Sequence, residues 1–219
     1  MNLQEHRRGA GYAVYTPGVL ALYDIFVIML SNRFIWQCPP NRIQDMYSRY
    51  GTINHLEAGP GTGFFLNRCR FPAGIVRLGL LDANPHCLRA AARRLDRYSP
   101  VTYCADIMKP LDIATAGFDS VGLNYVLHCL PGPMPAKAVA LSNLKQLMNR
   151  GGVLFGSTLL HCGVRRSLPA RCLMSLYNRC GIFANAQDDL EGLRCILRQH
   201  FSESGVETAG CAAVFWGRR

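Results

Sequence analysis

Three glycines at alternate positions constrain the fold of this chain more than any other feature. Residues 53–63 read Ile-Asn-His-Leu-Glu-Ala-Gly-Pro-Gly-Thr-Gly, and Phe-Phe-Leu follows. The apolar residues before Glu57 predict a strand, the glycines predict a tight turn, and the residues after them predict the start of a helix. A strand that passes through a glycine turn into a helix is typical of a nucleotide site.

The acidic residue at the end of this strand narrows the class of ligand. Glu57 stands two positions before Gly59, where a carboxylate would repel a pyrophosphate and attract a cationic ligand. The dinucleotide fingerprint also requires a glycine three positions after its second glycine. Phe64 occupies that position, so the turn does not fit a nicotinamide or flavin site.

Further predicted strands follow the turn, and predicted helices separate them. The strands are expected over residues 77–82, 101–104, 118–128 and from 150 onward. The helix after the second strand is expected over residues 88–98, after the turn formed by Ala83, Asn84 and Pro85. This alternation predicts a parallel sheet with helices on both faces. Residues 205–216 alternate around Gly210 and predict two final strands.

The pattern Glu-x-Gly-x-Gly-x-Gly, followed by Asp82 and Asp106 at the next two strand ends, resembles the class I S-adenosylmethionine-dependent methyltransferases. The resemblance implies an α/β three-layer sandwich. Its seven-stranded, mostly parallel, twisted sheet has an antiparallel last strand, which inserts between the fifth and sixth. Helices cover both faces, and an N-terminal helical lid covers the site.

The resemblance also implies S-adenosylmethionine as cofactor and S-adenosylhomocysteine as its product. Asp82 would bind the ribose hydroxyls, and Asp106 would lie near the adenine. The residues expected to contact the cofactor are Glu57, Ala58, Gly59, Pro60, Gly61, Gly63, Asp82, Ala83, Asn84, Ala105, Asp106, Ile107, Asn124, Tyr125, Tyr15 and Tyr23.

Two helices are expected before the glycine strand, over residues 16–31 and 41–50. Each begins near a proline, which suits the first helical position. We expect a single domain over residues 1–219. Its expected parts are an N-terminal helical lid over 1–51, a cofactor-binding core over 52–160, and substrate-side helices with a terminal hairpin over 161–219.

Methyl transfer from a sulfonium is an in-line displacement, so the enzyme mainly holds the reactants and excludes water. A general base helps when the nucleophile carries a proton. His128 and His161 follow the fourth and fifth predicted strands, and both are candidate catalytic bases. The alternative for His128 is a packing role.

The formal net charge of +10 raises the question of a nucleic-acid substrate. The arginines are scattered, which favours solvated faces over a binding patch. Nucleic-acid N-methyltransferases would carry Asn/Asp-Pro-Pro-Tyr after the fourth strand, whereas this chain has Asn124-Tyr125-Val126-Leu127. We therefore expect a small, largely apolar or aromatic acceptor with an oxygen, nitrogen or carbon nucleophile. The alternatives are an RNA methyltransferase, a cofactor-binding protein without activity, or a non-methylating reaction on the same fold.

Ten cysteines without a Cys-x-x-Cys pair favour reduced core residues over disulfides or a metal site. No secretion signal is evident, and the apolar stretch over residues 19–30 is interrupted by Asp24 and too short to span a bilayer. We expect a cytoplasmic protein, monomeric or homodimeric, that binds no metal and no membrane.

Overall fold

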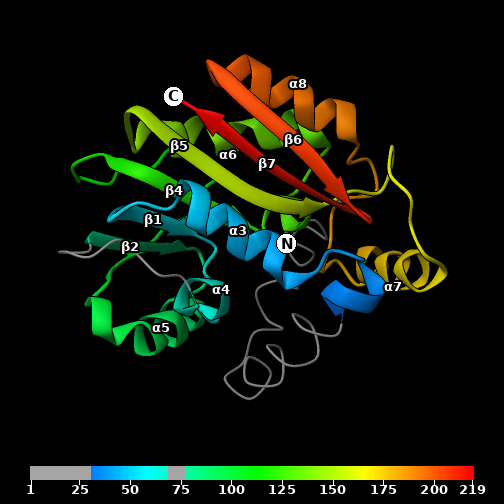
Figure 1. Cartoon of the computed structure of the whole chain (residues 1–219), viewed down its shortest axis with the longest axis horizontal. Helices are drawn as coiled ribbons and strands as arrows, with labels where there is room; N and C mark the ends of the chain where they lie inside the picture. The colour runs from blue at the N-terminus through cyan, green and yellow to red at the C-terminus, as the bar shows by residue number, and fades with distance from the viewer. Residues whose placement is uncertain (1–30, 69–76) are drawn as a thin grey trace, which may run out of the picture.

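Seven strands form one sheet in residues 31–68 and 77–219, the part of the chain that this computed structural model describes (Figure 1). The strand order is β3-β2-β1-β4-β5-β7-β6. Neighbours from β3 to β5 pair in parallel, whereas β7 runs antiparallel to β5 and β6. The expected sheet is confirmed, with the last strand between the fifth and sixth. The strands are β1 (Asn54–Ala58), β2 (Arg77–Asp82), β3 (Val101–Cys104), β4 (Phe118–Asn124), β5 (Met148–Leu159), β6 (Glu203–Ala209) and β7 (Ala212–Arg218).

Helices cover both faces of the sheet and give the predicted three layers. Helices α6 and α8 pack on one face, and α3, α4, α5 and α7 on the other (Figure 1). The α-helices are α3 (Pro40–Tyr50), α4 (Phe64–Asn67), α5 (Pro85–Arg94), α6 (Met134–Gln146), α7 (Leu168–Arg179) and α8 (Leu190–His200). Two short 3₁₀ turns are η2 (Asp96–Tyr98) and η3 (Leu127–Cys129).

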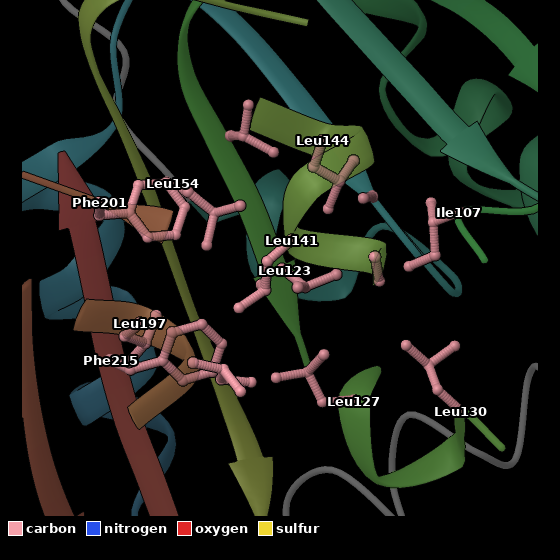
Figure 2. Close-up of a cluster of buried hydrophobic side chains, with 14 of the residues drawn as sticks. Ile107, Leu123, Leu127, Leu130, Leu141, Leu144, Leu154, Leu197, Phe201 and Phe215 are labelled. Carbon is pink, nitrogen blue, oxygen red and sulfur yellow. The ribbon is translucent and has the colours of Figure 1, made fainter. Parts of the chain in front are cut away.

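Both faces of the sheet bury apolar cores, and one face also buries a group of polar side chains. Alternate side chains of a strand point to opposite faces, and Leu123 of β4 joins an apolar core against α6 and α8 (Figure 2). The labelled members of this core are Ile107, Leu123, Leu127, Leu130, Leu141, Leu144, Leu154, Leu197, Phe201 and Phe215. Ser120 and Asn124 belong to the other face of β4, where they are buried and form hydrogen bonds. A polar cluster thus lies beneath α3.

Several predicted boundaries are wrong. Strand β4 was expected to reach His128 but ends at Asn124, because Tyr125 has a left-handed backbone with φ 56° that breaks the extended chain. Helix α5 begins at Pro85 instead of residue 88, because the Asn84 side chain accepts a hydrogen bond from the backbone N–H of His86 and caps the first turn. The helix also ends at Arg94 instead of residue 98, and η2 follows it. Strand β5 begins at Met148 instead of residue 150.

Several other expected elements are confirmed. Helix α3 has the predicted position, and α7 and α8 are helices within the expected substrate-side part, residues 161–219. The terminal hairpin turns at Gly210, where φ is 58°. The expected helix over residues 16–31 lies outside the described residues, apart from Ser31. Within residues 31–68 and 77–219, every helix is too short or too polar to cross a membrane.

Candidate functional site

The three glycines of the turn after β1 all have positive φ angles: 68° at Gly59, 55° at Gly61 and 74° at Gly63. Other residues rarely adopt this region. A Cβ atom on Gly59 would lie 2.3 Å from Cγ2 of Val126, and one on Gly63 would lie 3.3 Å from Cα of Ala91. A Cβ atom on Gly61 would meet no atom of the described residues within 4 Å. The outer glycines let the turn pack tightly, and the described residues leave space at the middle one.

Asp82 ends β2 beside the glycine turn. Its Oδ1 accepts a hydrogen bond from the backbone N–H of Asn84 at 2.8 Å. Burial raises the pKa of Asp82 to about 6, although backbone hydrogen bonds from Asn84 and Ala83 oppose the shift. A carboxylate fixed at this edge of the sheet is suited to accept hydrogen bonds from hydroxyl groups.

Asp106 follows β3 at the same edge. Its Oδ1 accepts a hydrogen bond from the backbone N–H of Met108 at 2.9 Å. The N–H of Ala105 donates to the carbonyl oxygen of Asp82 at 3.2 Å, so the two strand ends are joined. Ile107 is buried in the core below. The structure therefore brings the predicted residues of the first three strand ends to one edge of the sheet.

Glu57 is buried, and protein donors engage both of its carboxylate oxygens. The Tyr47 hydroxyl, on α3, donates to Oε1 at 2.6 Å, and Nε2 of His55 lies 3.0 Å from Oε2. The His55 tautomer with its hydrogen on Nε2 donates to this oxygen. Gly122 on β4 leaves room for this group, since a Cβ atom there would lie 2.1 Å from Oε2. Neither Tyr47 nor His55 was predicted, although the spacing of His55 and Glu57 places both on one face of the strand.

Asn124, at the carboxyl end of β4, extends the same group. Its Nδ2 donates to the Tyr47 hydroxyl oxygen at 3.0 Å, and its Oδ1 accepts from Oγ of Ser157 at 3.1 Å. Tyr125 follows, and its ring centroid lies 6.0 Å from that of His128. Both predicted residues therefore lie where β4 ends, near the glycine turn.

His128 lies in η3 and is buried. Its Nδ1 faces the backbone N–H of Leu159 at 3.4 Å, and its ring packs edge-on against Phe183 with centroids 4.5 Å apart. Burial lowers the pKa of His128 to about 3, and the positive charge of Lys137 acts in the same direction. The ring is therefore neutral near pH 7, with its accepting nitrogen turned toward β5. This geometry favours the packing role.

His161 follows β5 and is partly exposed. Its backbone N–H donates to the carbonyl oxygen of Asp188 at 2.9 Å, and Nδ1 lies 3.6 Å from Sγ of Cys162. Partial burial lowers its pKa, and Arg166 adds to the effect. A neutral imidazole with an accessible nitrogen can accept a proton. Of the two predicted bases, His161 has the more accessible ring.

Aromatic side chains gather beyond the ends of β4 and β5. Phe183 lies at their centre, with ring centroids 4.9 Å from Tyr177, 6.1 Å from Trp36 and 4.5 Å from His128. Tyr177 and Phe183 are partly exposed. We call Trp36, Tyr125, His128, Tyr177 and Phe183 the aromatic cluster. The sequence did not single out Tyr177 or Phe183, because their contacts join segments far apart in the chain.

The segment that presents Phe183 is tied to α6 by a buried ion pair. Nζ of Lys137 lies 2.5 Å from Oδ2 of Asp188 and donates to the carbonyl oxygen of Ala184 at 3.1 Å. Both charged side chains are fully buried. The backbone N–H of Ala184 donates in turn to the carbonyl oxygen of His128 at 2.8 Å. The chain between α7 and α8 is therefore fixed beside η3.

Tyr15 and Tyr23, which were expected to contact the cofactor, lie outside the described residues. Within residues 31–68 and 77–219, no group of three or more histidine, cysteine or acidic residues could hold a metal ion.

A glycine turn beside strand-end carboxylates, in a seven-stranded sheet with an antiparallel last strand, defines the class I S-adenosylmethionine-dependent methyltransferases. Comparison with known proteins agrees. Residues 56–154 match the family described as a methyltransferase domain. Demethylluteothin O-methyltransferase of Streptomyces thioluteus is 36% identical over 94% of this chain and 89% of its own length.

Two further comparisons agree. The physcion biosynthesis cluster O-methyltransferase of Aspergillus chevalieri is 33% identical over 94% of this chain and 93% of its own. The structure of DhpI in complex with SAH has the same fold, with a TM-score of 0.66 and 16% identity over 99% of this chain and 96% of that one. The chain therefore belongs to the S-adenosylmethionine-dependent methyltransferases.

Proposed function

We propose that this enzyme transfers the methyl group of S-adenosylmethionine to an oxygen atom of a small, largely apolar or aromatic metabolite. The names of two relatives support oxygen as the acceptor atom, since both are O-methyltransferases. The aromatic cluster supports the class of acceptor, because ligand pockets are lined mainly by apolar and aromatic side chains. The acceptor would lie against Tyr177 and Phe183, so residues 161–219 would form the substrate side.

The cofactor would lie at the carboxyl ends of β1, β2 and β3. The glycine turn fits such a ligand, because the described residues leave space at Gly61 that a side chain would fill. Asp82 would accept both ribose hydroxyls, and Asp106 would accept from the adenine amino group. The other residues proposed to line the cofactor are Ala58, Gly59, Pro60, Gly63, Ala83, Asn84, Ala105, Ile107, Asn124 and Tyr125.

The bound cofactor would supply a methyl group on a positively charged sulfur for in-line attack by the acceptor oxygen. The side chains of the protein orient the acceptor and exclude water from it. We propose that Nε2 of His161 takes the proton from the acceptor hydroxyl, since Nδ1 lies beside Cys162. His128 would support the aromatic cluster by packing.

The observation on which this proposal most depends is the space at Gly61, where a Cβ atom would meet no described atom within 4 Å, in a turn that the Gly59 N–H joins to the carbonyl oxygen of Leu81. The test incubates the purified protein with methyl-labelled S-adenosylmethionine and either small phenols or transfer and ribosomal RNA. Label in a phenol supports the proposal. Label only in RNA would favour the RNA alternative, which the net charge of +10 suggests. Cofactor binding without transfer would favour a non-methylating role.

The expected location and assembly complete the proposal. We propose a cytoplasmic protein that acts as a monomer or homodimer and needs no metal. Light scattering of the purified chain would measure its assembly, and activity in the presence of a chelator would test the need for a metal.

A further inference from the structure

The face of the sheet beneath α3 buries a continuous chain of hydrogen bonds. It begins at Ser157 and passes through Asn124 and Tyr47 to Glu57. From Glu57 it continues to His55, whose Nδ1 lies 2.8 Å from Oγ of Ser120. Four of the sheet residues, His55, Glu57, Ser120 and Ser157, are at most 3% exposed. Burying so many polar groups is unfavourable unless each finds a partner.

The direction of these bonds fixes two groups at the site. Since the Tyr47 hydroxyl donates its only hydrogen to Glu57, it must accept from Asn124. The Asn124 amide is thereby held with its nitrogen toward α3 and its oxygen toward Ser157. Glu57 is held from both sides, and Ala58 alone separates it from Gly59, the first glycine of the turn.

The contacts of Glu57 therefore differ from those expected of a direct cofactor ligand. Its two oxygens face Tyr47 and His55, within a space that Gly122 leaves open between the strands. The ring of Tyr47 is also fixed, because it packs edge-on against Phe155 with centroids 5.1 Å apart. The contacts with Tyr47 and His55 therefore hold the Glu57 carboxylate within the sheet.

We propose that Tyr47 and His55 are positioning residues for cofactor binding. They act through Glu57, which anchors the glycine turn to α3 and β4 instead of contacting the cofactor. Tyr47 also orients Asn124 at the end of β4. This inference rests on the proposed binding of S-adenosylmethionine.

The test measures the Kd of S-adenosylhomocysteine by calorimetry in three variants. Tyr47→Phe keeps the ring against Phe155 but removes the hydroxyl, and the expected loss of affinity is about tenfold. His55→Gln should weaken binding by a similar factor. Tyr50→Phe is the matched control on the same helix, and its affinity should equal that of the wild type, since Tyr50 stacks on Trp216.

A double-variant cycle separates positioning from direct contact. In a Glu57→Gln background, Tyr47→Phe should weaken binding much less than it does in the wild type, because only its contact with Asn124 remains to be lost. Near-wild-type binding by Tyr47→Phe and His55→Gln, together with strong impairment of Glu57→Gln, would show direct contact and overturn the inference. Fully independent losses in the double variant would overturn it as well.

Two controls keep the outcomes distinct. If the wild type does not bind S-adenosylhomocysteine, the proposed function fails, whatever the variants do. Circular dichroism and thermal unfolding report whether each variant folds. If Tyr47→Phe does not fold, His55→Gln applies the same test through the other oxygen of Glu57. If neither folds, the chain of hydrogen bonds serves folding and the inference is wrong.

Discussion

At the scale of single residues, the ionisation of Asp82 should make cofactor binding depend on pH. Its pKa is raised to about 6, mainly by burial, and the ionised form is the better acceptor for two ribose hydroxyls. We expect the affinity for S-adenosylhomocysteine to fall about tenfold for each pH unit well below 6. Asp82→Asn should weaken binding at pH 8 by about 1.5–3 kcal/mol and remove this pH dependence. Calorimetry from pH 5 to 8 measures both effects, and unchanged affinity in the variant would refute the assignment.

The same carboxylate should affect the ligand-free protein in the opposite sense. Its folded-state pKa of about 6 lies above the ordinary aspartate value of about 3.9. The folded state therefore binds more protons between these values, and its stability decreases as the pH rises through this range. Asp82→Asn should raise the Tm at pH 7, and the gain should disappear toward pH 4. A lower Tm for the variant at pH 7 would contradict this reading.

His161 and His128 provide a matched pair of variants. His161→Gln should reduce the rate of methyl transfer about a hundredfold while the Kd of S-adenosylhomocysteine stays unchanged. His128→Gln should mainly lower the Tm, because the buried ring packs against Phe183. Rates under saturating cofactor and thermal unfolding separate these effects. A folded His128→Gln variant that binds cofactor normally but has lost transfer would identify His128 as the base.

At the scale of elements, Lys137 joins α6 to the segment before α8. The pKa of Lys137 is lowered and that of Asp188 is raised by burial, while their mutual attraction opposes both shifts. Oδ1 of Asp188 has no hydrogen-bond partner among the described residues. The pair therefore depends on its direct contact, at 2.5 Å.

Removing one partner of this ion pair should reduce the free energy of unfolding more than removing both partners. Lys137→Met should reduce the free energy of unfolding by about 3–5 kcal/mol, because Asp188 would remain buried and uncompensated. Adding Asp188→Leu should recover most of that loss. Urea unfolding of the single and double variants measures the difference. A double variant that is less stable than Lys137→Met would contradict this account.

Local sequence signals predicted most elements but not every boundary. The glycine turn, β2, β3 and the hairpin at Gly210 each have a local signal, and all were located correctly. Asn84-Pro85 also carries the signal of a capped helix start, but the helix was expected to begin three residues later, at residue 88. The end of β4 could not be read in this way, because Tyr125 adopts a left-handed backbone without being glycine. Its N–H donates to the carbonyl oxygen of Ser157, which is a tertiary contact.

The residues of the candidate site also fall into two groups, those with a local sequence signal and those brought together only by tertiary packing. Residues at strand ends, such as Asp82 and Asp106, could be predicted because parallel strands bring their carboxyl ends to one edge. The contact of Tyr47 with Glu57 depends on how α3 packs across the sheet, which no local pattern specifies. Phe183 likewise meets His128 only through the fold of the segment between α7 and α8.

At the scale of the whole molecule, the two faces of the sheet have different roles. The face against α6 and α8 buries an apolar core (Figure 2). The face under α3 buries a second apolar core and, beside it, the hydrogen-bonded chain that includes Glu57. Both meet at the carboxyl edge of the sheet, where the glycine turn, Asp82 and the aromatic cluster lie. This arrangement supports a small acceptor held beside a cofactor at the edge.

The most direct test of this account is methyl transfer from labelled S-adenosylmethionine to small phenolic acceptors, measured for the wild type and for Gly61→Leu. The wild type should label a small acceptor. The variant should stay folded, because its Cβ atom meets no described atom within 4 Å. The left-handed backbone at this position should reduce its stability by about 1–2 kcal/mol. The variant should nevertheless lose cofactor binding and transfer. Equal transfer by both proteins, or label found only in RNA, would contradict the account.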